Sequence, residues 1–218
     1  MLMNRTTPFM VPVDDANPAI IKNEALCSEC GHCFAVCEEE IGVAAKYLLN
    51  QREVYQCIGC GQCNTKQKGC VFGDDCINEI IAKAETADGF VFGTPVYYAH
   101  PSGRVQSFLD RVFYSSGRNF ACKPGAAVAV ARRGGCSASF DVMNKYFGIS
   151  QMPVAGSTYW NSVHGRTQGE ASQDEEGLQT MRNLARNMAW MMKCFEAGKE
   201  KGILPPAAER THMTNFIR

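Results

Sequence analysis

Cysteine is the residue whose number and spacing in this chain point to chemistry. The sequence has 12 cysteines, and most of them lie in its first third. Eight form two groups with repeated gaps of two residues: Cys27, Cys30, Cys33 and Cys37, and then Cys57, Cys60, Cys63 and Cys70. Thiolates are strong metal ligands, and in a reducing compartment such a density indicates metal binding or redox chemistry rather than disulfides.

The spacing within each group favours iron over zinc. Three cysteines at C-x2-C-x2-C with a more distant fourth are typical of [4Fe–4S] ligation in bacterial ferredoxins. Zinc is the alternative, but it usually takes cysteines as separated pairs. Gly31, Gly59 and Gly61 permit the tight backbone that wraps around a compact cluster. We therefore expect two [4Fe–4S] clusters.

The fourth ligand of each cluster stays open at this point. In two-cluster ferredoxins the last cysteine of each run binds the other cluster, which would exchange Cys37 and Cys70 between the groups. However, Glu38 and Val71 replace the proline that normally follows, and Cys76 competes with Cys70. The remaining cysteines stand singly in apolar surroundings and are expected to be packing residues: Cys122, Cys136 and Cys194.

Composition narrows the class of protein. Lys and Arg together number 22, as do Asp and Glu, so the formal net charge is zero. A nucleic-acid or anionic-membrane partner needs a clear basic excess, and we expect neither. The longest apolar run, residues 126–131, is far shorter than the roughly 18 residues of a membrane helix. The first residues lack an apolar signal region, which predicts a cytoplasmic protein.

Helix and strand patterns alternate after about residue 76. Strands are expected at residues 90–92, 126–131 and 152–159. Helices are expected after Asp75, after Ser102, after Ser137 or Ser139, and from Ser172 to about Gly198. This order predicts an α/β fold with a parallel sheet and helices on both faces. Ligands of such sheets bind beyond the carboxyl ends of the strands, here residues 94–102, 131–136 and 159–165.

Several of these segments carry a family resemblance. Residues 93–98 (GTPVYY), Ser102 and residues 108–111 (FLDR) resemble the flavin-loop signature of the NADPH-dependent FMN reductase, flavodoxin-like superfamily. The cysteines from Cys57 to Cys70 resemble the cluster motif of its iron–sulfur flavoprotein branch. The similarity covers about residues 55–218, whereas Cys27 to Cys37 resembles a two-cluster ferredoxin segment. We therefore predict two domains, a ferredoxin-like iron–sulfur segment (1–75) and a flavodoxin-like FMN domain (76–218).

The resemblance implies bound FMN and a homo-oligomer, either a dimer or a tetramer. The chain departs from the family in two respects. Residues 1–56 show no counterpart of the Ser/Thr/Arg-rich turn that holds the FMN phosphate. The first central strand is also not evident, and residues 9–13 are a weak candidate for a replacement because Pro8 and Pro12 disfavour a strand. The residues that it assigns to the flavin lie in the three strand-end loops: Thr94, Pro95, Val96, Tyr97, Tyr98, Ser102, Gly134, Gly135 and Tyr159.

The sequence thus predicts an iron–sulfur flavoprotein oxidoreductase in which electrons pass between [4Fe–4S] clusters and FMN. The donor is expected to be NAD(P)H or a ferredoxin-type redox protein, and the acceptor a small molecule or a protein. The alternative is a non-catalytic two-cluster electron carrier or electron-delivery subunit without a working flavin site.

Overall fold

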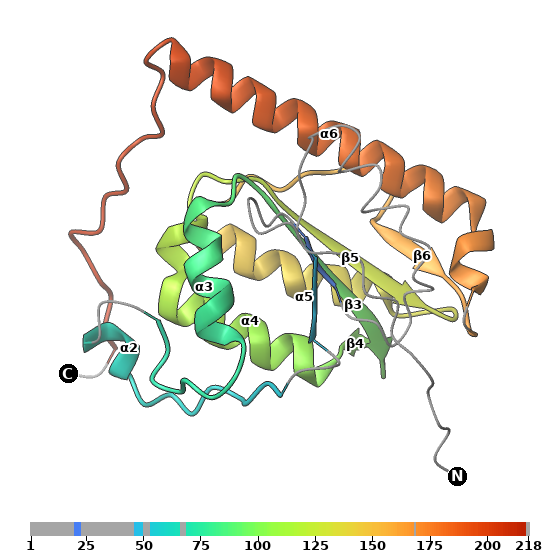
Figure 1. The fold of residues 1–218 in the computed structure, drawn as a ribbon, viewed down its shortest axis with the longest axis horizontal. Helices are drawn as coiled ribbons and strands as arrows, with labels where there is room; N and C mark the ends of the chain where they lie inside the picture. The colour runs from blue at the N-terminus through green and yellow to red at the C-terminus, as the bar shows by residue number, and fades with distance from the viewer. Residues whose placement is uncertain (1–19, 23–45, 50–52, 66–68, 168, 217–218) are drawn as a thin grey trace.

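A parallel β-sheet forms the centre of the molecule (Figure 1). The computed structural model describes residues 20–22, 46–49, 53–65, 69–167 and 169–216. The sheet runs in the order β2-β1-β3-β5-β6, all parallel, and the short β4 pairs antiparallel with β3. Its strands are β1 (Ile20–Lys22), β2 (Lys46–Leu48), β3 (Phe90–Tyr97), β4 (His100–Pro101), β5 (Gly125–Ala131) and β6 (Ser162–His164).

The strand order places the direction change of the sheet between β1 and β3. The chain passes from β1 to β2 on one side and then crosses back to β3 on the other, which is the doubly wound arrangement. The expected absence of a first central strand is therefore wrong, because Ile20–Lys22 occupies that place and pairs with β3. The first cysteine group and the connection that follows β1 lie outside the described residues.

Helices cover both faces of the sheet, as predicted. The helices α3 (Ile77–Thr86), α4 (Gly103–Ser116) and α5 (Cys136–Ile149) pack on one face, and α6 (Glu175–Glu200) lies on the other (Figure 1). Side chains alternate between faces along a strand, so Phe90 and Phe92 join the first core while Val91 packs against the second. Three short helical segments complete the structure: α2 (Gln62–Thr65), η2 (Gly117–Phe120) and η3 (Glu170–Gln173).

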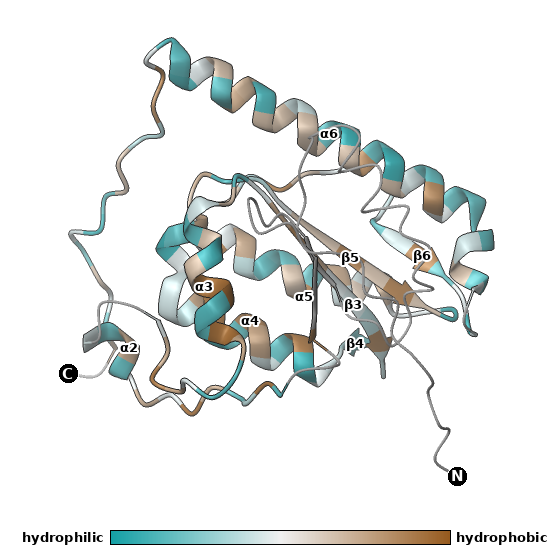
Figure 2. Cartoon of the chain, viewed as in Figure 1, coloured by the Kyte–Doolittle hydropathy of each residue, from teal (hydrophilic) through white to brown (hydrophobic). Residues whose placement is uncertain are grey.

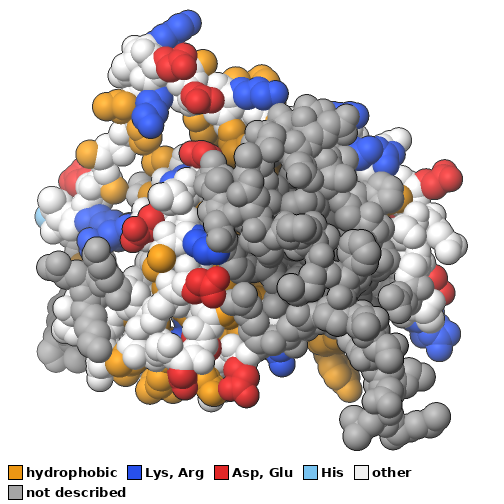
Figure 3. Space-filling model, in the orientation of Figure 1, with side chains coloured by type: hydrophobic (Ala, Val, Ile, Leu, Met, Phe, Trp, Pro, Cys, Tyr) orange, Lys and Arg blue, Asp and Glu red, His pale blue; other side chains and the backbone are white. Residues whose placement is uncertain are grey.

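The distribution of apolar and hydrophilic residues follows this layering. Apolar residues concentrate on β3 and β5, while hydrophilic residues recur along α6 (Figure 2). Acidic and basic side chains are interspersed over the coloured part of the face in Figure 3, in keeping with the balanced charge. None of the described helices is both long and apolar enough to span a membrane. After α6 the chain continues as an exposed, extended segment to residue 216.

Some element boundaries differ from expectation. Residues 152–159 make only a single parallel bridge, Gly125 to Val154, and the strand comes later as β6. Pro153 has no N–H donor, so the pairing cannot extend to the residues before this bridge. Strand β3 continues past its Gly-Thr-Pro sequence to Tyr97, pairing with β5 as far as Pro95 and then with β4.

Two predicted helix caps are also wrong, and one is confirmed. Gly135, with a φ of 97°, precedes α5 in place of Ser137 or Ser139. Asp174 caps α6 in place of Ser172, and its carboxylate accepts a hydrogen bond from the Gly177 amide. Ser102 caps α4 as predicted, since its hydroxyl accepts from the Val105 amide.

Phe92 lies at the centre of the larger core. Its ring, 1% exposed, has five aromatic neighbours with centroids between 5.5 and 6.4 Å away: Phe90, Phe108, Phe113, Phe120 and Phe147. These rings come from β3, α4, η2 and α5, so one side chain joins four elements.

Replacing Phe92 with Ala should therefore lower the free energy of unfolding by about 3–5 kcal/mol, because the ring leaves a cavity that its neighbours fill only partly. Urea unfolding followed by circular dichroism measures this loss. Ile149→Ala is the control, since that side chain is 81% exposed and should change stability by less than about 0.5 kcal/mol. A loss below about 1 kcal/mol for Phe92→Ala would contradict this role.

Candidate functional site

The second cysteine group lines one hollow. All four of its cysteines line a space of about 330 Å³, counting the open mouth: Cys57, Cys60, Cys63 and Cys70. Cys57 and Cys60 are exposed at this mouth, whereas Cys63 and Cys70 are half-buried. The rest of the wall comes from the same loop and from α4: Ile58, Gly61, Val71, Phe72, Arg111, Tyr114 and Ser115.

Glycines make the tight loop of this group possible. Gly59 and Gly61 have φ values of 64° and 68°, which is left-handed backbone that residues with a Cβ rarely adopt. The carbonyl of Gly61 then accepts a hydrogen bond from the Asn64 amide at 3.0 Å as α2 begins. The backbone therefore turns between successive cysteines and directs them to one side, as the sequence predicted.

Asn78 positions the fourth cysteine. Its side-chain oxygen accepts a hydrogen bond from the Cys70 amide at 2.7 Å, and its side-chain nitrogen donates to the carbonyls of Cys70 and Phe72 at 3.0 and 2.8 Å. The preceding Gly69 has a φ of 79°, and a Cβ there would lie 2.4 Å from the Asn78 oxygen. The Cys70 loop is therefore held by the first turn of α3.

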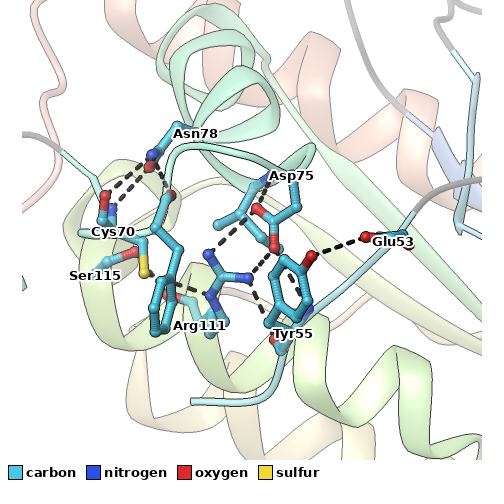
Figure 4. Close-up of polar contacts among 9 residues, drawn as sticks. Glu53, Tyr55, Cys70, Asp75, Asn78, Arg111 and Ser115 are labelled. Carbon is cyan, nitrogen blue, oxygen red and sulfur yellow. Dashed lines mark hydrogen bonds and ion pairs between the residues drawn. The ribbon is translucent and has the colours of Figure 1, made fainter. Parts of the chain in front are cut away.

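Arg111 also lines the hollow, and Figure 4 shows its polar contacts. Its Nε donates to Cys70 Sγ at 3.4 Å, one terminal nitrogen donates to the Tyr55 carbonyl at 3.2 Å, and both terminal nitrogens contact the Asp75 carboxylate. The guanidinium also lies 5.2 Å from the Phe72 ring centroid. Burial tends to lower the pKa of Arg111, but its hydrogen bonds to Asp75 and Cys70 outweigh that effect and raise the pKa.

The environment of Cys63 disfavours its thiolate. Burial raises the pKa of this thiol, and repulsion from Cys70, Cys60 and Cys57 raises it further. Four thiolates would thus require cationic compensation, which iron supplies. Among the described residues, no three Cys, His, Asp or Glu side chains converge closely enough for a single metal ion.

The other cysteines of the described chain lie elsewhere. Cys76, the competing fourth ligand, is buried in the core and does not line the hollow. Cys136 is buried beneath β5, and burial raises the pKa of its thiol to about 11. Cys37 falls outside the described residues, so the exchange of fourth ligands between the two groups stays a prediction.

The predicted flavin loops begin with a strained turn. Tyr97 pairs with His100, and the two residues between them, Tyr98 and Ala99, have φ values of 51° and 60°. Such two-residue hairpin turns normally hold Asn-Gly, because both positions need left-handed backbone. Strained residues of this kind concentrate at functional sites. The turn also presents aromatic surface, since Tyr97 is 48% exposed and Tyr98 fully exposed.

The loop after β5 packs directly on this turn. A Cβ at Gly135 would lie 2.7 Å from the Ala99 Cα and 2.8 Å from Val96 Cγ1, so no side chain fits. Gly134 beside it has open space. The third loop joins the second through His164, whose Nε2 lies 3.1 Å from the Arg133 carbonyl oxygen. The exposed rings of Tyr159 and Trp160 lie 6.0 Å apart on this third loop.

Two of the predicted flavin residues, Thr94 and Ser102, use their polar groups in hydrogen bonds within the protein. The Thr94 hydroxyl donates to the Pro95 carbonyl and accepts from the Ser102 amide at 3.0 Å. Thr94 and Ser102 are only 2% and 4% exposed. Their side chains hold the start of α4 against β3, and Pro95 is buried beside them.

Sequence reasoning missed Arg111, Asp75 and Asn78 as part of the cysteine site. The sequence contained a signal for one of these three residues, Arg111. Arg111 follows Phe108 by one helical turn, so it lies on the apolar face of α4, where a charged residue requires a buried partner. Nothing in the local pattern identifies Asp75 as that partner, because 36 residues separate the two.

Comparison with known proteins agrees with this geometry. Residues 35–167 match the NADPH-dependent FMN reductase family. The chain belongs to this family. An iron–sulfur flavoprotein of Methanocaldococcus jannaschii is 31% identical over 194 residues, which cover 85% of this chain and 95% of that protein. One of Methanosarcina thermophila is 28% identical over 180 residues, which cover 76% of this chain and 92% of that protein.

Solved structures support the same fold. A WrbA-like flavodoxin from Agrobacterium tumefaciens superposes with a TM-score of 0.56 at 13% identity, covering 82% of this chain and 98% of that one. The expected flavodoxin-like parallel sheet is confirmed.

Gly135 and Gly134 provide a matched pair for testing how the loops pack. Gly135→Ala should lower the free energy of unfolding by about 1–3 kcal/mol, because it combines a φ of 97° with a close contact to Ala99. Gly134→Ala should change stability by less than about 0.5 kcal/mol. Denaturant titration of both variants checks this difference, and equal effects would show that the two loops do not touch.

Proposed function

We propose that this protein is an iron–sulfur flavoprotein oxidoreductase that transfers electrons between [4Fe–4S] clusters and FMN. The observation that carries the proposal is the hollow lined by Cys57, Cys60, Cys63 and Cys70 in a chain of the NADPH-dependent FMN reductase family. The curated relatives bear the name iron–sulfur flavoprotein, which supports the same combination of cofactors.

The two cysteine groups would each hold one cluster. Cys57, Cys60, Cys63 and Cys70 suffice for the second cluster because all four face one space. The first cluster rests on the spacing of its own group: Cys27, Cys30, Cys33 and Cys37. In this proposal residues 1–75 carry the iron–sulfur segment, which also contributes β1 and β2 to the sheet, and residues 76–218 carry the flavin domain.

FMN would lie over the strand-end loops. The rings of Tyr97, Tyr98 and Tyr159 offer exposed aromatic surface for a flat isoalloxazine. Gly134 and Gly135 precede α5, whose first amides have no partner within the helix and suit carbonyl or phosphate oxygens. Thr94, Pro95, Val96 and Ser102 hold this edge in place from beneath.

The cofactors supply complementary chemistry when bound, since clusters carry one electron at a time whereas FMN accepts one or two. The chain would therefore couple one-electron and two-electron partners. We propose NAD(P)H or a ferredoxin-type protein as the donor, a small molecule or a protein as the acceptor, and a cytoplasmic dimer or tetramer as the working form.

One sequence observation favours a second candidate function. Residues 1–56 contain no Ser/Thr/Arg-rich turn for the FMN phosphate, and without that anchor the chain would be a two-cluster electron carrier. Anaerobic purification followed by iron, sulfide and flavin assays distinguishes the two. About eight irons with stoichiometric FMN support the oxidoreductase, and eight irons without FMN after reconstitution support the carrier.

Cysteine variants test the second cluster. Cys63→Ser and Cys70→Ser should each reduce the iron content from about eight to about four per chain, because each removes a ligand from the same hollow. Cys76→Ser and Cys194→Ser should retain all the iron, since the first is a core residue and the second is exposed on α6. Iron loss in Cys76→Ser with retention in Cys70→Ser would reverse the assignment of the fourth ligand.

Tyr98→Ala tests the flavin loops. Loss of the exposed ring should weaken FMN binding about two- to tenfold, since an aromatic contact contributes about 0.5–1.5 kcal/mol. Titration of apoprotein with FMN, followed by quenching of flavin fluorescence, measures the dissociation constant. Trp190→Ala, an exposed aromatic on α6, should bind FMN unchanged. Equal affinity in all three proteins would place the flavin elsewhere.

A further inference from the structure

We propose that Arg111 is a positioning residue that raises the reduction potential of the cluster held by Cys57, Cys60, Cys63 and Cys70. It would do so through a charge-assisted hydrogen bond from its Nε to Cys70 Sγ, which lie 3.4 Å apart. This inference rests on the proposed function, because it assigns a role to Arg111 in one of the proposed clusters.

The Arg111 side chain is fixed by all of its surroundings. Its terminal nitrogens donate to the Tyr55 carbonyl and to both oxygens of Asp75, and its guanidinium packs over Phe72. The side chains of Arg111 and Asp75 are 1% and 0% exposed. These contacts fix the plane of the guanidinium, and its single Nε–H then points to Cys70 Sγ (Figure 4).

Charge explains why this contact affects reduction. A [4Fe–4S] cluster with four thiolate ligands is an anion, and reduction adds one more negative charge. Hydrogen bonds to the ligand sulfurs and nearby charges are established means by which a protein sets cluster potentials. A buried cation beside Cys70 stabilises the reduced form more than the oxidised form, because little water is present to screen it.

Asp75 orients the Arg111 guanidinium and also reduces the effect of its positive charge on the cluster. Its carboxylate lies on the far side of the guanidinium from Cys70, accepts a hydrogen bond from the Ile77 amide at 3.1 Å, and is thereby fixed at the start of α3. It keeps Arg111 pointing at the sulfur but offsets part of the positive charge. Removal of the Asp75 charge should therefore act in the opposite direction to removal of Arg111.

A purely structural role for Arg111 makes a different prediction. Arg111 also ties the segment at Tyr55, the Cys70 loop and the start of α3 to helix α4. If that were its whole role, substitutions would change stability or iron retention and leave the potential of any retained cluster unchanged.

Redox titration of anaerobically purified protein, followed by electron paramagnetic resonance, separates the two roles. Arg111→Lys keeps the charge but cannot reproduce the fork of donors, and Arg111→Gln removes the charge. Both should shift the potential of one cluster to more negative values, with at least a tenfold fall in the equilibrium constant for reduction in Arg111→Gln, which is about 59 mV for one electron. Asp75→Asn should shift it to less negative values.

Arg104→Lys is the matched control. Arg104 also lies on α4, but it donates to the Leu49 carbonyl at 2.8 Å and does not line the hollow, so the potential should not change. Unchanged potentials in Arg111→Lys and Arg111→Gln at full iron content overturn the inference. If both Arg111 variants lose the cluster, Asp75→Asn decides, since an unchanged or more negative potential also overturns it. Wild-type protein without iron would instead refute the proposed function.

Discussion

The buried ion pair between Arg111 and Asp75 is the interaction that organises the cysteine site. Taking both charges out of water is costly, and such a pair is tolerated only when the remaining donors and acceptors are satisfied. Here Tyr55, Cys70 and Ile77 supply the remaining partners. As a result, the helix that covers the sheet and the loop that carries the cysteines share one network of hydrogen bonds.

The strand-end loops depend on a different constraint, which is close backbone approach. Tyr98 and Ala99 hold left-handed backbone without the glycine or asparagine that such a turn prefers. The absence of a side chain at Gly135 lets the next loop support that turn from one side. The exposed tyrosines are therefore presented by a rigid backbone, although they lie at the surface.

The sequence alone predicted the features that rest on a repeated pattern of residues. Alternating apolar segments predicted the parallel sheet with helices on both faces, and cysteine spacing predicted one shared site for the second group. It was harder to predict which of several neighbouring residues caps a helix and where a strand forms. Asp174 rather than Ser172 caps α6, and residues 152–159 form a single bridge where the composition favoured a strand. Long-range partners were invisible, because no local pattern links Asp75 to Arg111 or β1 to β3.

The location of the second cysteine group has a consequence for how the fold accommodates it. The second cysteine group belongs to the connection between β2 and β3, and no paired strand passes through its described parts, residues 53–65 and 69–72. Lengthening a connection adds little entropic cost, since that cost grows only with the logarithm of its length. Among the described cysteines of this loop, Cys70 alone packs against the core that contains Phe92. The described part of this cysteine loop is attached to the sheet through α3 and α4 rather than through strand pairing, so a change in its length need not alter the strand register.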